Sequence, residues 1–203
     1  NQALKMQLEG AQKEMEKLID AKDEIIALFS IKHSELEFET EIGHGSFGIV
    51  WKGTFRSDAV AIKTCRVTKI TPSVVKDFMK ELKLMVPLKH ANLVNLVGGC
   101  WTDGPDKLCL VLEYCAQGSL KDLLVATDRE MLKHDWAHPF FGIAMGIASC
   151  FRFFHHELPS GEALLHRDLK TENILVSRED GRYALKVADF GRTVFVPPQP
   201  SET

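Results

Sequence analysis

Three closely spaced glycines interrupt an alternating apolar stretch, in the run Gly43-His44-Gly45-Ser46-Phe47-Gly48-Ile49-Val50. Glycines at this spacing let backbone amides approach phosphate oxygens without obstruction by side chains. A dinucleotide-binding loop would need a helix to begin at the third glycine. Residues 49–55 are instead β-prone and lead into a polar turn at Arg56-Ser57-Asp58 and a further apolar run. The pattern therefore favours a glycine-rich turn within a β-hairpin.

Short runs of alternating apolar and polar residues continue along the chain. Five of them predict strands, and the first three form an antiparallel meander: residues 36–42, 49–55, 59–64, 93–100 and 108–113. Thr71 and Pro72 provide an N-cap and a first-turn proline for a helix that continues to about Val86. Later residues predict two helices and then a small strand-rich stretch, at 120–126, 136–156 and 163–187.

The first thirty residues contain no proline and many charged side chains. Their apolar residues recur at alternating spacings of three and four, interrupted only by Lys22: Leu4, Leu8, Ala11, Met15, Leu18, Ile25 and Phe29. This spacing predicts an amphipathic helix at residues 1–30. Two interpretations stay open. The apolar stripe can pair with another chain, as a coiled coil or homodimer, or it can lie against the neighbouring domain of its own chain.

A lysine ends the apolar strand Val60-Ala61-Ile62-Lys63. In the following helix, Glu81 lies three residues after Phe78 and four before Met85, so its carboxylate shares the apolar, inward face. A buried carboxylate needs a cationic partner to offset the loss of hydration. The sequence therefore predicts an ion pair between Lys63 and Glu81.

Two further motifs follow in a fixed order, His166-Arg167-Asp168-Leu169-Lys170-Thr171-Glu172-Asn173 and Asp189-Phe190-Gly191. Together with the glycine-rich run, Lys63 and Glu81, they resemble the signature set of protein kinases, and the resemblance covers residues 36–203. The lysine after H-R-D-L resembles the serine/threonine type. The residues of the N-terminal lobe, at about 36–114, resemble the tyrosine-kinase-like group.

The resemblance implies an α+β fold with two lobes. The N-lobe, at about residues 36–114, would hold an antiparallel five-stranded sheet and one helix, and the amphipathic helix would precede it. The C-lobe, at about residues 115–203, would be mainly helical and incomplete. A complete kinase domain continues through an A-P-E motif, whereas this chain ends twelve residues after Gly191.

The resemblance also implies ATP and Mg²⁺ as ligands, with a role for each motif. Lys63, paired with Glu81, would bind the α- and β-phosphates, and Asn173 and Asp189 would ligate magnesium. Asp168 would accept the proton of the substrate hydroxyl, and Lys170 would reach the γ-phosphate. The glycine-rich residues that would contact the nucleotide are Gly43, Gly45, Ser46, Phe47 and Gly48.

An apolar slot for adenine is implied in the same way, formed by Ile42, Val50, Ala61 and Leu175, with Leu112 as gatekeeper. The backbone of Glu113, Tyr114 and Cys115 would be the hinge. The stacked residues that link the two lobes of an active kinase would be Met85, Leu96, His166 and Phe190.

The implied activity is transfer of the γ-phosphate of ATP to serine or threonine hydroxyls of a protein substrate, in signal transduction. Two alternatives stay open: a non-catalytic pseudokinase scaffold, and an inactive truncated fragment that associates through its N-terminal helix. The phosphate, metal and base positions all carry the expected residue types, which favours the enzyme for the intact protein.

The composition argues against several other partners. A net charge of -3 supplies no basic field for nucleic acid. The five cysteines form no C-x-x-C pair, which argues against a zinc site or a disulfide framework and favours the reducing cytoplasm. The longest apolar stretch, residues 139–154, is too short and too interrupted to span a membrane.

Overall fold

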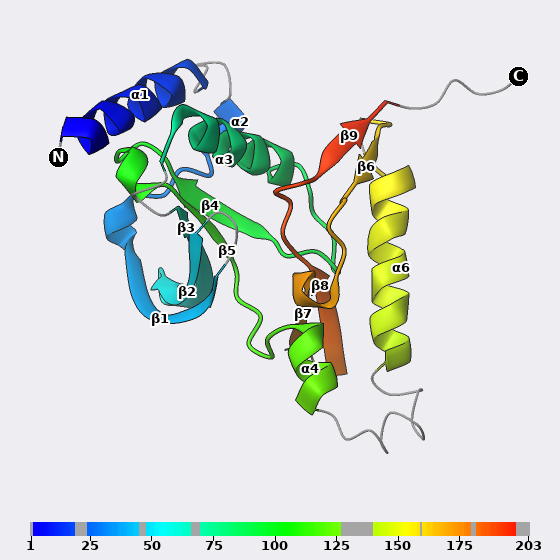
Figure 1. Cartoon of the computed structure of the whole chain (residues 1–203). Helices are drawn as coiled ribbons and strands as arrows, with labels where there is room; N and C mark the ends of the chain where they lie inside the picture. Colours follow the sequence, from blue (N-terminus) through cyan, green and yellow to red (C-terminus); the bar gives the residue numbers. More distant parts are fainter. Residues whose placement is uncertain are drawn as a thin grey trace, which may run out of the picture. The chain divides into compact units, whose positions relative to one another are not determined.

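The computed structural model of the chain describes residues 2–18, 24–44, 48–65, 70–126, 140–158, 160–179 and 182–197. The chain forms two compact units, coloured along the sequence in Figure 1. Unit 1 comprises Asn1–Leu88 and Asn95–Tyr114, and unit 2 comprises Lys89–Val94 and Cys115–Thr203. The chain crosses between the units three times, and the last crossing, between Tyr114 and Cys115, lies within the stretch expected to be the hinge.

Unit 1 contains the five-stranded antiparallel sheet that the sequence predicts. Its strands are β1 (Leu36–His44), β2 (Gly48–Phe55), β3 (Asp58–Cys65), β4 (Leu96–Cys100) and β5 (Cys109–Glu113), in the order β1-β2-β3-β5-β4. Arg56 and Ser57 join β2 to β3 with φ angles of 50° and 71°. A two-residue turn with both φ angles positive matches the twist of the strands that it connects.

Strand β4 begins three residues later than the sequence predicts, at Leu96 rather than at Leu93. The backbone of the missing residues has other partners, because Val94 N donates to Val187 O at 3.0 Å and Leu93 forms a bridge with Val187. Both contacts lie within unit 2. Leu93 and Val94 therefore belong to a different unit from the strand that they precede.

Helix α3 (Pro72–Met85) covers one face of the sheet. Thr71 caps it as predicted, since the Thr71 hydroxyl accepts a hydrogen bond from Val74 N at 3.3 Å and Pro72 occupies the first turn. A core lies between this helix and the sheet, formed by residues that include Phe78, Leu82 and Leu110. A second core on the opposite face includes Phe55, Val60 and Ile62.

The residues before the sheet form α1 (Gln2–Leu18), α2 (Glu24–Ala27) and the short 3-10 helix η1 (His33–Glu35). The helix predicted over residues 1–30 is therefore too long at its end, because residues 28–30 are not helical and Ser30 pairs with Gly99 of β4. Helix α1 lies along α3, as Figure 1 shows, and buries Ala11 and Met15 there. Between α2 and η1, Gly99 N donates to Phe29 O and Ile31 N donates to Gly99 O, both at 2.9 Å. This segment thus pairs with the outer edge of β4, and Ile31 enters the second core.

Unit 2 contains α4 (Leu120–Ala126), α6 (Phe140–His156), the 3-10 helix η4 (Thr171–Asn173) and two small sheets. One sheet pairs β6 (Ala163–Leu165) with β9 (Val194–Val196), and the other pairs β7 (Ile174–Glu179) with β8 (Arg182–Val187). The beginning of the helix expected at 136–156 lies outside the described residues.

Helix α6 packs against β6 and β8, and Gly146 allows the close approach. A Cβ at Gly146 would lie 2.5 Å from Leu185 Cδ2 and 2.9 Å from Asn92 Nδ2. Among the helices of the described residues, none is long and apolar enough to cross a membrane.

Candidate active site

The predicted ion pair between Lys63 and Glu81 is present in unit 1. Lys63 Nζ lies 2.8 Å from Glu81 Oε1 and 3.1 Å from Oε2, so it donates to both carboxylate oxygens. The side chains are 14% and 4% exposed, respectively. Strand β3 supplies the lysine and α3 the glutamate. The ion pair therefore connects α3 to the sheet in a partly dehydrated environment, and its two hydrogen bonds fix the relative position of the two side chains.

Three of the apolar residues expected around the adenine, Val50, Ala61 and Leu112, share the sheet face that carries Lys63. Val50 lies opposite Lys63 in the β2–β3 register, and Leu112 lies opposite Ala61 in the β3–β5 register. Ile42 projects from β1 with 46% of its surface exposed. Unit 1 thus gathers four of the five residues expected to form the slot and its gatekeeper. The fifth residue, Leu175, lies on β7 in unit 2.

The glycine-rich stretch joins β1 to β2, as the hairpin interpretation predicts. Gly43 lies opposite Val50, and Gly48 lies opposite Cys65. A Cβ at Gly43 would meet no described heavy atom within 4 Å, so packing within the described residues does not explain this glycine. Gly45, Ser46 and Phe47, at the tip, lie outside the described residues.

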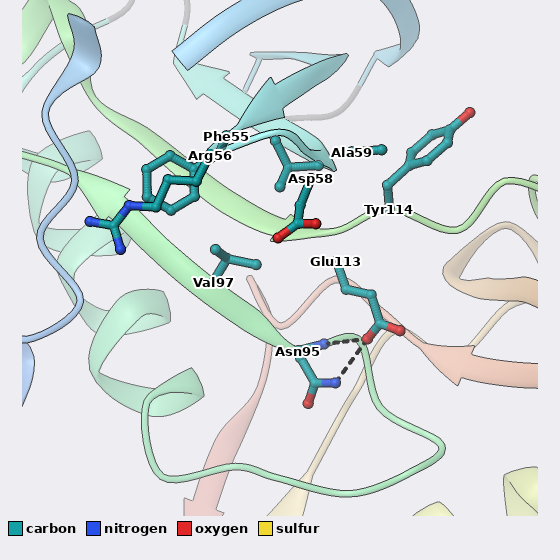
Figure 2. Close-up of a pocket in the computed structure, with 9 residues that line it drawn as sticks. Phe55, Arg56, Asp58, Ala59, Asn95, Val97, Glu113 and Tyr114 are labelled. Atoms are coloured by element: carbon teal, nitrogen blue, oxygen red, sulfur yellow. Dashed lines mark hydrogen bonds between the residues drawn. The ribbon is translucent and has the colours of Figure 1, made fainter. Parts of the chain in front are cut away.

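Glu113 ends β5 at the expected hinge and is fixed to the start of β4. Its Oε2 accepts hydrogen bonds from Asn95 N at 3.1 Å and from Asn95 Nδ2 at 2.9 Å (Figure 2). Tyr114 closes unit 1 and lies under the ammonium group of Lys52, 5.9 Å from the ring centroid. Cys115 is buried at the start of this part of unit 2.

A pocket of about 490 Å³ opens in unit 1 beside the turn between β2 and β3. Figure 2 shows its lining, which consists of Phe55, Arg56, Asp58, Ala59, Val60, Asn95, Val97, Glu113 and Tyr114. Phe55 and Val60 belong to the core on the sheet face opposite Lys63. The pocket therefore contains none of the apolar residues of the expected adenine slot, although Glu113 and Tyr114 of the expected hinge line it. No motif indicated it, because its lining comes from a turn and several strand ends.

In unit 2, the loop between β6 and β7 gathers three of the predicted catalytic and metal-binding residues. The Asp168 carboxylate accepts hydrogen bonds from Lys170 Nζ at 3.0 Å and from Asn173 Nδ2 at 2.9 Å. Asn173 Nδ2 also donates to the backbone oxygen of Asp168 at 2.8 Å. The bond from Lys170, followed by the bond from Asn173, holds the pKa of Asp168 below its usual range. The carboxylate is therefore ionised and fixed in direction at neutral pH.

His166 holds this loop from the other side, a role that the sequence did not indicate. Its Nδ1 accepts a hydrogen bond from Asp168 N at 3.3 Å, so the ring proton is on Nε2, which donates to Ala188 O at 2.9 Å. Burial lowers the pKa of His166, although the contact with Ala188 and the charge of Asp189 oppose this effect. A neutral imidazole of this tautomer makes both bonds and joins the loop to the residue before Asp189.

Asn173 and Asp189, the expected magnesium ligands, are neighbours through their backbones. Ala188 N donates to Asn173 O at 2.9 Å, and Asp189 follows with a φ of 66°. A non-glycine residue in this conformation costs about 1–3 kcal/mol and is often found at functional sites. Because Asn173 Nδ2 is directed to Asp168, its amide oxygen remains as the donor atom for a cation.

Phe190 is buried in unit 2 and packs its ring against His166 and Phe154, with centroids 5.4 Å and 6.1 Å away. It therefore adjoins His166, as the expected stack requires within this unit. The other expected members, Met85 and Leu96, belong to unit 1, where Met85 is buried. The link between the two halves of the stack stays a prediction.

Comparison with known proteins identifies the same family as the motifs do. The family model of protein tyrosine and serine/threonine kinases matches residues 36–199. The chain therefore belongs to the protein kinase family. The match begins at the first strand of the sheet, so residues 2–35 with α1 and α2 lie before it.

Several curated relatives are serine/threonine kinases by name. The probable serine/threonine-protein kinase roco6 of Dictyostelium discoideum is 37% identical over 160 residues, which is 77% of this chain and 7% of that protein. The probable kinase drkB of the same organism is 35% identical, over 79% of this chain and 22% of its own length. Serine/threonine-protein kinase STY17 of Arabidopsis thaliana is 30% identical, over 80% of this chain and 26% of its own length. The chain thus spans less than a third of each of these relatives.

Proposed function

We propose that this chain is the nucleotide-binding and catalytic part of a protein kinase that transfers the γ-phosphate of ATP to serine or threonine hydroxyls of proteins. The observation that carries the proposal is the Asp168 carboxylate, ionised and held at once by Lys170 and Asn173. Curated relatives of the chain are named as probable serine/threonine-protein kinases, which supports this choice of hydroxyl.

Asp168 acts on the acceptor hydroxyl. The hydroxyl oxygen forms a bond to the γ-phosphorus while the bond from that phosphorus to the bridging oxygen of ADP breaks, and the hydroxyl proton passes to Asp168. The lowered pKa keeps the carboxylate ionised, so that it can accept a hydrogen bond from the hydroxyl and orient it for attack. Lys170, which donates to Asp168 at 3.0 Å, supplies a positive charge for the transferred group.

The remaining residues suit ATP and Mg²⁺. Lys63 presents an ammonium group whose position is fixed by Glu81, as binding of the α- and β-phosphates requires. The amide oxygen of Asn173 and the carboxylate of Asp189 are hard oxygen donors of the kind that Mg²⁺ prefers. When bound, the ion would neutralise charge on the phosphates. The family generally uses both ligands.

The other two interpretations have less support. A pseudokinase scaffold would commonly lack one of Lys63, Asp168, Asn173 or Asp189, and all are present. Association through a coiled coil would need the apolar stripe of α1, whose Ala11 and Met15 are 0% and 1% exposed against α3. We therefore assign the stripe to packing within unit 1.

The test compares the wild-type full-length protein with Asp168→Asn, and uses transfer of radiolabelled phosphate from ATP to a generic serine/threonine substrate. The substitution should lower kcat by about 10²–10⁴-fold and leave the KM for ATP nearly unchanged, because the carboxylate acts on the hydroxyl. Asp106→Asn, an exposed aspartate of the β4–β5 turn, is the matched control. Absence of transfer in all three proteins would favour the scaffold.

A further inference from the structure

Residues that precede the kinase match contact the helix that carries Glu81. The match begins at residue 36, whereas α1 ends at Leu18. Helix α1 packs along α3, and Gln7 Nε2 donates a hydrogen bond to Ile70 O, just before α3 begins. Gly10 faces Pro72, since a Cβ at Gly10 would lie in ordinary van der Waals contact with Pro72 Cγ, at 3.7 Å. The two helices are therefore closely packed at the N-terminal end of α3.

Helix α1 also contacts the sheet side of unit 1. Besides α3, it lies against the 3-10 helix η3 (Pro105–Lys107) in the turn between β4 and β5. Ala11 and Met15 are fully buried in one cluster whose other members come from both sides. Those from α3 and its approach are Ile70, Val75, Phe78, Met79 and Leu82, and those from the sheet side are Trp101, Leu108 and Leu110. Helix α1 thus holds α3 and the sheet together.

The Lys63–Glu81 ion pair spans the same two elements. Lys63 lies on β3 of the sheet and Glu81 on α3, so their 2.8 Å contact requires α3 to keep its position against the sheet. A close-packed core transmits a displacement of one element to its neighbours, because few voids are available to absorb it. We propose that α1 is a positioning element of the kinase, and that Met15 acts through α3 to hold Glu81 on Lys63.

This inference rests on the proposed function for its catalytic readout. The test pair is Met15→Ala and Met6→Ala, two identical substitutions on α1 in the full-length protein. Met15 is 1% exposed in the cluster, whereas Met6 is 66% exposed. Alanine keeps the helix favourable in both cases. We expect Met15→Ala to lower kcat/KM roughly 2- to 30-fold, the usual range for indirect coupling, and Met6→Ala to leave it unchanged.

A double-mutant cycle with Glu81→Gln distinguishes an effect of Met15 through Glu81 from a general loss of stability. If Met15 acts through Glu81, Met15→Ala should cost much less activity when Glu81→Gln is already present. An equal fold-loss in both backgrounds would overturn the proposal, as would equal losses from Met15→Ala and Met6→Ala. If turnover of Glu81→Gln is too slow to measure, the same four proteins are compared by their ATP affinity, measured by calorimetry. Met15→Leu, which keeps the volume, should restore activity.

Two further measurements keep the test decisive. Gln7→Ala removes the hydrogen bond to Ile70 O and should also lower kcat/KM. This variant replaces Met15→Ala in the test if Met15→Ala does not fold. Hydrogen–deuterium exchange of residues 75–85 reports on α3 without any activity. It should be faster in Met15→Ala than in the wild type and Met6→Ala. A wild type without phosphotransfer refutes the proposed function, whereas unchanged exchange in Met15→Ala refutes the role of α1.

Discussion

Removal of Lys63 is the perturbation whose cost follows most directly from the structure. At 2.8 Å and an effective dielectric constant of ~20, the gross attraction between Lys63 and Glu81 is about 6 kcal/mol. The dehydration of both groups offsets most of it in the native pair. Lys63→Met keeps an unbranched side chain that is one atom shorter, but it leaves the Glu81 carboxylate, only 4% exposed, without this cation. Breaking a buried pair in this way costs about 3–5 kcal/mol.

Hydrogen–deuterium exchange of the full-length protein measures this cost locally. Protection of the α3 amides should fall roughly 10²–10⁴-fold in Lys63→Met, because a tenfold change corresponds to 1.36 kcal/mol. Lys63→Met combined with Glu81→Leu should recover most of the protection, since an apolar pair needs no counter-charge. Lys52→Met is the control, because the Lys52–Glu39 pair on β1 and β2 is exposed and should change protection little. A loss below tenfold in Lys63→Met, or no recovery in the double variant, would refute the reasoning.

Three further predictions concern single residues. Asp189→Ala should make calorimetric ATP affinity independent of magnesium, whereas the wild type should bind more weakly after chelation; equal responses would contradict the ligand assignment. Burial lowers the pKa of His166, so neutral His166 stabilises the fold above the ordinary pKa near 6.5, and this stability is lost as the pH falls below that value. An NMR titration midpoint of His166 above 6.5 would refute this. Thr71→Ala should destabilise α3 by about 1 kcal/mol in exchange measurements, and Thr71→Ser should not; equal losses would exclude the cap.

The sheet and the Lys63–Glu81 pair could be predicted because their signals are local. Alternating apolar residues define each strand, and the glycine-rich run followed by β-prone residues requires a hairpin. Glu81 on the apolar face of α3 requires a cation, and the preceding strand offers Lys63. Each of these signals comes from neighbouring residues of one element, and the sheet and the ion pair form as predicted.

Features that depend on a choice between partners could not be predicted. The stripe of α1 suits either a second chain or α3, and only the packing of Met15 distinguishes them. Strand β4 starts late because the backbone of Val94 pairs with Val187, a contact between residues far apart in the sequence. The tautomer of His166 depends on two backbone atoms brought together by the loop. No residue type or spacing reports such contacts.

The pairing of residues 29–31 with Gly99 has a consequence for the outer strand of the sheet. Strand β4 is an edge strand, and a free edge offers unpaired amides and carbonyls to any other extended chain. Phe29 and Ile31 occupy those groups at Gly99, and the Ile31 side chain covers Gly98, where a Cβ would lie 2.5 Å from Ile31 Cδ1. A truncated protein that begins at residue 36, where the family match begins, would lack both α1 and the residues 29–31 that pair with β4. Such a fragment should aggregate edge to edge, so the shortest well-behaved form of unit 1 begins upstream of the kinase homology.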